Sequence, residues 1–204
     1  MWNTLPTVEV VARTAAALNA NGIQATIVKT GSEAKQLALE TIPRGVTVMT
    51  NSSVTIEQIE LLTHLEHNSY YKSVRQQIAS AGESHSERHE ARRRHLAVDW
   101  AVGSVNAVTQ DGQLVLASRT GSQLPFGAFS ANHVLWIVGA QKIVAGLPEA
   151  WQRVYEYCLE RVEERLARTL GHEARSYINR LLVVTREEQV GRIQVILVNE
   201  ELGF

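Results

Sequence analysis

The chain has 204 residues, 45% of them hydrophobic and 20% charged, so it suits one globular domain that buries its own apolar core. Its formal net charge of −1 gives no general attraction to nucleic acid or to an anionic membrane surface. The single cysteine, Cys158, excludes an internal disulfide and any cysteine-ligated cluster held by one chain.

Helices and strands alternate in the first third of the chain. Residues 5–22 have the apolar spacing of an amphipathic helix, which the turn Asn21-Gly22 ends. A helix at 32–42 is expected to be capped by Ser32. The other elements predicted here are, in order, a strand at 23–29, a buried strand at 45–50 and a helix at 54–65.

A long polar and partly helical excursion, residues 67–96, interrupts this alternation. After it, residues 106–118 alternate on both sides of Asp111-Gly112, which is a strong signal for a β-hairpin. Residues 147–170 have the spacing of a long amphipathic helix that buries Cys158 on its apolar face. The remaining strands are expected at 98–104, 133–139, 180–185 and 191–199.

Short buried strands that alternate with helices predict an α/β fold, with a mostly parallel sheet flanked by helices and an embedded antiparallel hairpin. The sequence has no repeats and no linker, so one domain over 1–204 is expected. The longest apolar run, residues 134–140, is too short to span a bilayer, and no basic segment precedes an apolar leader. We therefore expect a cytoplasmic protein that binds neither membrane nor nucleic acid.

Such a sheet also predicts where a ligand would bind, because open α/β sheets hold ligands outside the carboxyl ends of their strands. The loops that leave three predicted strands are rich in small and polar residues, and the turn at 119–123 follows the hairpin. Glycine allows close backbone approach, hydroxyls donate hydrogen bonds, and a lysine supplies a full positive charge to a carboxylate or phosphate. The candidate ligand-binding residues are Asn51, Ser52, Ser53, Gly103, Ser104, Asn106, Thr120, Gly121, Ser122, Gln123, Gly139 and Lys142.

Each of these loops also has a purely structural interpretation. The turn Thr120-Gly121-Ser122-Gln123 resembles ordinary turn chemistry, and on that basis alone a plain turn is favoured. Residues 51–53 are placed to cap the helix that begins near Val54. Lys142 is equally compatible with a solvated lysine at a strand end.

Catalytic and metal-binding candidates are few. His133 begins a strand that we expect at the mouth of the site, and Asp111 is the other weak candidate for an acid or base. His85 and His89 have a spacing that can hold a metal on one helix face, but no further ligand is evident, so no metal site is predicted. The run of arginines at 92–94 is interpreted as a solvated helix or a subunit contact.

The segments "GSVNAVTQDGQLVLAS", "GSQL", "HVLWIVGAQKIVAGLPEA" and "GRIQVILVNEELGF" resemble the LUD (lactate-utilisation) domain family, in its short single-domain branch. This resemblance implies the fold shared by glucosamine-phosphate and ribose-phosphate isomerases and CoA transferases. It also implies a link to bacterial oxidation of L-lactate beside partners that carry iron–sulfur clusters. Because the chain carries no ferredoxin-like cysteine motif, no cofactor is expected within it, and any cluster would belong to a partner.

The resemblance leaves two main functions open. One is a subunit auxiliary to lactate (2-hydroxy acid) oxidation, which binds a small anionic ligand and docks on iron–sulfur oxidoreductase partners. The other is a free-standing transferase or isomerase-like enzyme for a phosphorylated or CoA-linked small molecule. CoA transferases of this fold use a glutamate just before a glycine turn, where this chain has Gln110, and an amide cannot form the acyl-anhydride intermediate. A third reading, a sensing or interaction protein, would use 67–96 as its contact surface, and the tail at 195–204 is a candidate contact in a homo-oligomer.

Overall fold

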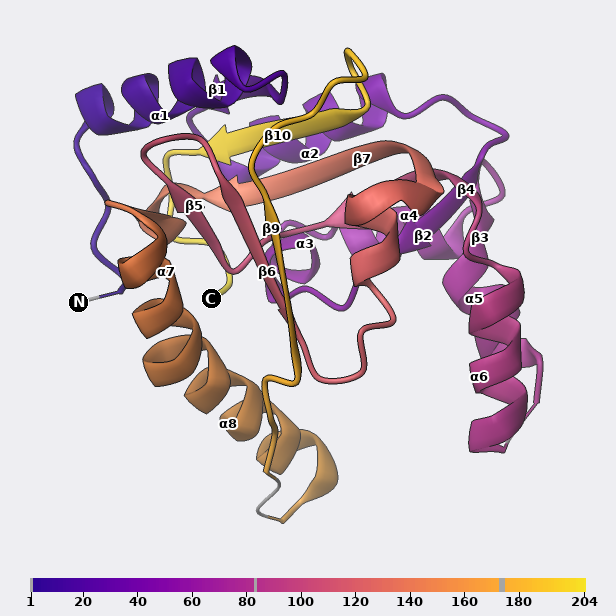
Figure 1. The fold of residues 1–204 in the computed structure, drawn as a ribbon. Coiled ribbons are helices and arrows are strands. Elements are labelled where there is room, and N and C mark those ends of the chain that lie inside the picture. Colours follow the sequence, from indigo (N-terminus) through magenta and orange to yellow (C-terminus); the bar gives the residue numbers. More distant parts are fainter. Residues whose placement is uncertain (1, 83, 173–174) are drawn as a thin grey trace.

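A six-stranded, fully parallel sheet forms the centre of the protein in the computed structural model, which describes residues 2–82, 84–172 and 175–204 (Figure 1). Its central strands read as continuous apolar runs because helices or a second sheet cover both faces. The strand order is β1 (Gln24–Val28), β10 (Ile193–Val198), β7 (Ala131–Gly139), β4 (Val98–Gly103), β2 (Thr47–Thr50) and β3 (Lys72–Ser73).

A second, four-stranded sheet packs against the first and contains the predicted hairpin. Its order is β8 (Ile143–Val144), β5 (Ala107–Thr109), β6 (Leu114–Ser118) and β9 (Arg180–Val184). The β5–β8 pair is parallel, whereas the pairs β5–β6 and β6–β9 are antiparallel. The predicted α/β class is therefore confirmed. The hairpin β5–β6 lies in this second sheet rather than in the parallel one, and β6 pairs there with β9 as well as with β5.

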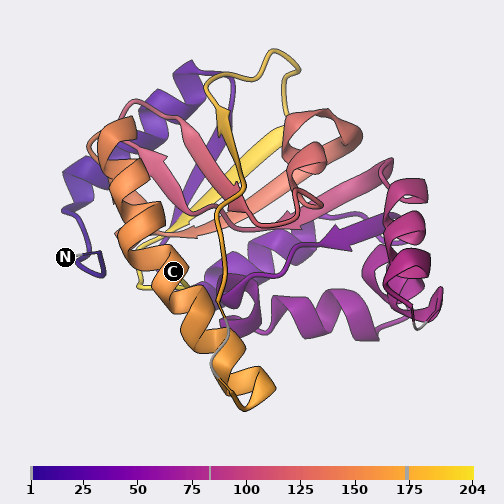
Figure 2. The same ribbon diagram turned by 60° about the horizontal axis from the view of Figure 1, so that its bottom comes forward.

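Helices cover the outer faces of this pair of sheets (Figures 1 and 2). On one face of the parallel sheet, an apolar cluster joins α2, α3 and α4 to alternate residues such as Leu135 and Ile137. On its other face, Val134 and Trp136 pack with α1, α5, α6 and the second sheet. The helices are α1 (Val8–Ala20), α2 (Gly31–Thr41), α3 (Val54–Gln58), α4 (Leu61–His67), α5 (Val74–Ser80), α6 (His85–Arg94), α7 (Leu147–Gln152) and α8 (Leu159–Leu170).

Three further helical segments join these elements. A π-helical turn, η1 (Phe126–Ser130), precedes β7, and a 3-10 turn, η2 (Ala140–Lys142), follows it. A second π-helical segment, η3 (Arg153–Cys158), links α7 to α8, so the helix predicted over 147–170 is continuous apart from this wider turn. Within the described residues, none of the helices combines the length and apolarity needed to cross a membrane.

Two predicted helix boundaries differ from the structure. Helix α2 begins one residue earlier than expected, and its cap is Thr30 rather than Ser32, since the Thr30 hydroxyl accepts a 3.2 Å hydrogen bond from the Glu33 amide. The helix predicted at 54–65 is broken into α3 and α4, because Glu60 has the left-handed conformation (φ +57°). The excursion at 67–96 is partly helical, as predicted, and its helices α5 and α6 stand beside the β3 edge of the sheet (Figure 1).

The carboxyl-terminal tail packs within its own chain. The Gln141 amide donates a 2.9 Å hydrogen bond to the carbonyl oxygen of Leu202, and the Gly203 amide donates one of 2.6 Å to Gln58. Leu202 itself is buried in the cluster with α2, α3 and α4. Leu202 is thus used inside its own chain, whereas Phe204 is half-buried, and contact of the tail with a second subunit stays a prediction.

Candidate functional site

A polar cavity of about 210 Å³ lies where β2, β4 and β7 end, three adjacent strands of the parallel sheet. The loops predicted to converge here do so, because the carboxyl ends of parallel strands meet at one edge. We call this cavity the lysine pocket. Its polar lining is Ser52, Ser53, Thr55, Ser104, Asn106, Gln123, Lys142 and Arg165, and its apolar lining includes Leu166 and Phe204.

Lys142 lies at the base of this pocket and is 1% exposed. Its Nζ atom donates hydrogen bonds to the Thr55 hydroxyl (2.9 Å), the Ser104 hydroxyl (3.0 Å) and the carbonyl oxygen of Val105 (3.3 Å). Burial, and to a lesser degree the neighbouring guanidinium of Arg153, lowers the pKa of the amine to about 7. Both protonation states of this amine are therefore accessible near neutral pH.

A second buried cation, Arg153, adds positive potential beneath the pocket. Its Nη1 atom donates to the carbonyl oxygen of Asn106 and to the Cys158 sulfur at 2.9 Å, whereas its Nε and Nη2 atoms have no hydrogen-bond partner among the described residues. Burial lowers the pKa of this guanidinium. No described Asp or Glu side chain lies within 4.0 Å of the cationic nitrogens of Lys142 or Arg153.

The lysine pocket therefore suits a small anion. At its rim, Arg165 of α8 donates a 2.7 Å hydrogen bond to Glu57 of α3, which ties two helices together across the opening. Inside, hydroxyl groups and amides surround the Lys142 amine, and its protonated form, without a nearby described Asp or Glu side chain, favours a carboxylate or phosphate oxygen. Not all polar groups are free for a ligand, since Asn106 Oδ1 already accepts a 2.8 Å bond from the Ala117 amide.

The predicted residues do not all share this cavity. Asn51 and Ser122 line an adjoining cavity of about 370 Å³, which we call the arginine pocket, and Ser52 and Gln123 line both cavities. The arginine pocket is also lined by Arg75, Arg88 and Arg92.

Thr120, Gly121 and Ser122 line a wider groove of about 930 Å³ beyond the arginine pocket. The turn is held by its own contacts: the Gly121 amide donates to the Ser118 hydroxyl at 2.9 Å, and the hydroxyls of Thr120 and Ser122 lie 3.0 Å apart. Gly121 has φ +82°, so a turn requires glycine here without any ligand. The turn therefore lines a groove, as a ligand-binding loop would, and is also stabilised by its own contacts, as a plain turn would be. Thr120 and Gly121 do not line the lysine pocket.

Two predicted glycines serve packing instead. A Cβ atom on Gly139 would lie 2.7 Å from the Leu202 amide nitrogen, so Gly139 admits the carboxyl-terminal tail. A Cβ atom on Gly103 would lie 2.9 Å from the Cβ atom of Asn51 and 3.0 Å from the Trp136 ring. Neither glycine lines the lysine or the arginine pocket.

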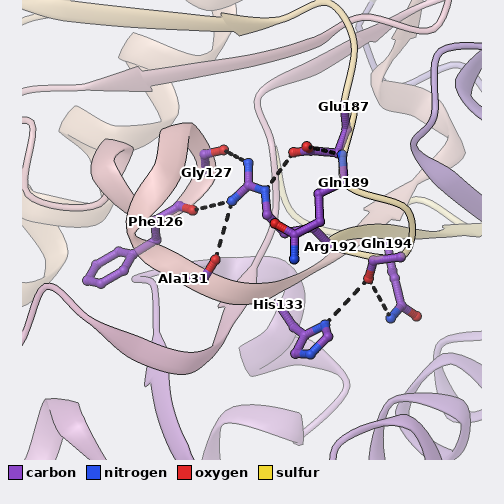
Figure 3. Close-up of polar contacts among 9 residues, drawn as sticks. Phe126, Gly127, Ala131, His133, Glu187, Gln189, Arg192 and Gln194 are labelled. Atoms are coloured by element: carbon purple, nitrogen blue, oxygen red, sulfur yellow. Dashed lines mark hydrogen bonds and ion pairs between the residues drawn. The ribbon is translucent and has the colours of Figure 1, made fainter.

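His133 lies near the amino-terminal end of β7, whereas the lysine pocket lies at the carboxyl ends of the strands. Its expected place at the mouth of the site is therefore corrected. It is the third residue of β7, whose last residue precedes Lys142 by three positions, so the length of the strand separates the two. Its ring stacks on Trp100 with centroids 4.7 Å apart, and its Nδ1 atom lies 3.5 Å from the carbonyl oxygen of Gly191 (Figure 3).

The hydrogen bonds of a residue near His133 hold backbone segments together. Nearby Arg192 is 8% exposed and donates a 2.6 Å hydrogen bond to Glu187 and one of 2.9 Å to the carbonyl oxygen of Gly127 (Figure 3). It also donates to the carbonyl oxygens of Phe126 and Ala131, at 3.4 Å each. This arginine thereby fixes the π-helical turn η1 against the start of β7.

Asp111 also lies away from the lysine pocket. It belongs to an open surface hollow with Gln110, Arg13 and Asn21, and its backbone oxygen accepts a 2.8 Å bond from the Asn21 side chain. Gly112 has φ +77° and donates a 2.9 Å bond to Thr109, as a tight hairpin turn requires. Neither candidate acid–base residue therefore projects toward Lys142.

The remaining sequence candidates carry no metal site in the described part of the chain. No group of three His, Cys, Asp or Glu residues there could hold an ion. His89 lines the wide groove, while the side chain of His85 lies outside the described residues. Cys158 is 2% exposed and contacts Arg153, as expected of a buried structural thiol.

Sequence reasoning left four polar residues of the site unmentioned, and it interpreted Arg92, which lines the arginine pocket, as part of a solvated helix or a subunit contact. Thr55 and Arg165 line the lysine pocket, and Arg75 and Arg88 line the arginine pocket. For Arg88 a signal was available: it stands four residues before Arg92, so the two share one helix face. The others depend on how separate helices pack, which spacing along the chain does not reveal.

Comparisons with known proteins agree with the family resemblance. The family model described as the LUD domain matches residues 11–198. A solved structure described as a DUF162 family protein from Deinococcus radiodurans is similar over 96% of this chain and 100% of that chain, with TM-score 0.57 and 14% identity. The search of curated proteins gives no match.

Two ribose-5-phosphate isomerases show weaker, partial likeness. Isomerase A from Neisseria gonorrhoeae has TM-score 0.36 and 10% identity over 57% of this chain and 54% of that chain. A D-ribose-5-phosphate isomerase solved with phospho-erythronic acid has TM-score 0.36 and 18% identity over 62% of this chain and 63% of that chain.

Proposed function

The chain belongs to the LUD domain family, and from this premise we propose that it binds a small carboxylate of the 2-hydroxy or 2-oxo acid class in the lysine pocket. L-Lactate and pyruvate are the simplest members of that class. The observation that carries the proposal is Lys142: a buried amine at the base of a polar cavity, with no described Asp or Glu side chain within 4.0 Å. A carboxylate placed there would supply the missing negative charge.

The size of the pocket supports a small ligand. At roughly 30 Å³ for one water molecule in the liquid, about 210 Å³ corresponds to some seven waters, which is ample room for a three-carbon acid. In this proposal the hydroxyls of Ser52 and Ser53 and the amide of Gln123, which also line the pocket, bind the substituent at carbon 2, beside a carboxylate at Lys142.

We assign the oxidation of such an acid to a complex rather than to this subunit alone. Removing two electrons from a 2-hydroxy acid requires an acceptor, and the resemblance to LUD proteins implies iron–sulfur partners in the cytoplasm. In this proposal the subunit holds and orients the acid, and the partner accepts the electrons.

A second candidate function is supported by the pKa of Lys142. Because burial lowers this pKa to about 7, the amine can accept and release a proton near neutral pH, as a general base or acid must. That property suits a free-standing transferase or isomerase-like enzyme acting on a phosphorylated or CoA-linked small molecule. CoA transfer through the hairpin is not proposed, because Gln110 stands at the nucleophile position and faces another surface.

A thermal-shift series tests the first proposal. Wild-type protein, Lys142→Met and the control Lys29→Met, which removes an exposed lysine, are heated with L-lactate, pyruvate, acetate and chloride. We expect lactate or pyruvate to raise the melting temperature of wild type and of the control, and to leave Lys142→Met unchanged. Equal shifts in all three proteins, or no shift in wild type at saturating acid, would contradict the proposal.

A further inference from the structure

The arginine pocket opens beside the lysine pocket and is strongly cationic. Arg75 comes from α5, and Arg88 and Arg92 come from successive turns of α6, while Ser122 comes from the turn after β6. Because Ser52 and Gln123 line both pockets, the two pockets are direct neighbours.

No carboxylate lines this pocket within the described part of the chain. The nearest acid to Arg75 is Glu66, whose Oε1 atom lies 3.7 Å from Arg75 Nε and also accepts a hydrogen bond from Thr50. The Nη1 atom of Arg75 is buried and has no hydrogen-bond partner among the described residues. One edge of this guanidinium is therefore held by Glu66, and the other is unengaged.

The acidic residues of α6 are occupied elsewhere. Glu87 accepts hydrogen bonds from the backbone and hydroxyl of Ser84, in the capping box of the helix. Glu90 forms an ion pair with Arg94 at 3.1 Å. Arg88 donates from Nε to the carbonyl oxygen of Gly82 at 3.0 Å, so its charge is not neutralised by this contact.

Asn51 gives an independent sign of a ligand. It follows β2 directly, is 4% exposed, and lines the arginine pocket, yet neither its Oδ1 nor its Nδ2 atom has a hydrogen-bond partner among the described residues. Burying an amide without partners costs free energy, which a bound polar group would recover. Gly103 leaves the space for this side chain, since a Cβ there would lie 2.9 Å from Asn51 Cβ.

We propose that the arginine pocket binds the phosphate group of a phosphate monoester whose acid end lies in the lysine pocket. Guanidinium groups match the oxygens of phosphate in pairs, and the Asn51 amide and the Ser122 hydroxyl add neutral donors. Lactate itself has no group to place among three arginines. The inference rests on the proposed function for the acid end and extends it: the ligand is a phosphorylated 2-hydroxy or 2-oxo acid.

Calorimetric titration of the full chain tests this with three probes: inorganic phosphate, L-lactate and the L enantiomer of 3-phosphoglycerate, which is L-lactate with a phosphate ester on carbon 3. The matched variants are Arg92→Gln, in the pocket, and Arg94→Gln, on the same helix but paired with Glu90. We expect 3-phosphoglycerate to bind wild type at least about tenfold more tightly than lactate does. Arg92→Gln should weaken phosphate and 3-phosphoglycerate about tenfold and leave lactate unchanged, and Arg94→Gln should change none of them beyond about twofold.

The outcomes separate this inference from the proposed function. Phosphate and 3-phosphoglycerate binding that is the same in Arg92→Gln and Arg94→Gln overturns the phosphate subsite, whatever lactate does. Phosphate binding that depends on Arg92, with no binding of any acid at the lysine pocket, supports the subsite and overturns the proposed function. A fourth probe, coenzyme A, distinguishes the source of the phosphate: if it binds more tightly than 3-phosphoglycerate and is insensitive to Lys142→Met, the bridging ligand is overturned in favour of a nucleotide.

Discussion

The amine of Lys142 donates a 2.9 Å hydrogen bond to the hydroxyl of Thr55, a residue 87 positions earlier in the chain. This contact joins the 3-10 turn after β7 to the first turn of α3, across the end of β4. It places a buried positive charge among hydroxyls rather than beside an acid. In the proposed function, the stability of the fold and the binding of an anion are therefore coupled at one atom.

Lys142 should make stability depend on pH. The pKa of the folded amine is about 7, against 10.5 for an ordinary lysine, so between these values the unfolded chain binds a proton that the folded chain does not. As pH rises from about 7 to 10.5, the free energy of unfolding should therefore increase, by up to about 5 kcal/mol from this group. Below pH 7 the amine is charged in both states, and the fold bears the full cost of burying that charge. Chemical denaturation of wild type and Lys142→Met near pH 6 and pH 9 checks this. A rise of the same size in both proteins would show that Lys142 does not cause it.

Affinity for a carboxylate should fall as pH rises through 7. Only the protonated amine offers a full charge, and its fraction falls about tenfold for each pH unit above the pKa. Dissociation constants for L-lactate measured between about pH 6 and pH 9 should follow that curve, since the ligand itself does not titrate there. Affinity that is constant over this range would mean that the charge of Lys142 does not hold the ligand.

Thr55→Val should weaken the site while preserving its shape. The change removes the hydroxyl that accepts from Lys142 and donates to the carbonyl oxygen of Leu202 at 3.2 Å. We expect a loss of about 1–3 kcal/mol in stability and a several-fold weaker binding of lactate, because the amine is left with one partner fewer. Thr55→Ser, which keeps the hydroxyl, is the control and should retain binding within about twofold. Equal effects of both changes would show that the loss of the hydroxyl is not their cause.

Gly139→Ala should release the carboxyl-terminal tail. The added Cβ would lie 2.2 Å from Gln141 Oε1 and 2.7 Å from the Leu202 amide nitrogen. The Leu202 nitrogen is a backbone atom, so the clash can be relieved only by moving the tail. A loss of about 1–3 kcal/mol is expected, with faster proteolysis after residue 199. The control is Gly146→Ala, where the nearest heavy atom would be 3.8 Å away. A variant as stable and protease-resistant as wild type would show that the tail does not need this glycine.

Much of the arrangement follows from sequence pattern alone. Apolar strands and polar loops predicted the α/β fold and the meeting of Ser52, Ser104 and Lys142, because parallel strands must end at one edge. The same rule would have placed His133, near the start of β7, at the amino-terminal end of the strands, away from the pocket. The hairpin was recognised from Asp111-Gly112, but the sheet to which it belongs depends on β9, about 70 residues away in sequence.

The cationic half of the site was not predictable from pattern. Arg75, Arg88 and Arg92 lie in a polar segment without a strong apolar period. The spacing of Arg88 and Arg92 puts them on one face of α6, but it does not indicate that this face lines a pocket. The burial of Asn51 depends on Gly103 in a neighbouring strand, a contact between segments some 50 residues apart. Tertiary packing, rather than local preference, decides both.

Calorimetry of L-lactate binding near pH 7.5, in two buffers of different ionisation enthalpy, tests the central claim most directly. If a carboxylate binds beside the Lys142 amine, it raises the pKa of that amine, and wild type takes up a substantial fraction of a proton with each ligand bound. Lys142→Met should show no such uptake and much weaker binding. Lactate binding to wild type without proton uptake, or with equal affinity in the variant, would contradict the assignment of Lys142 as the anion-binding group.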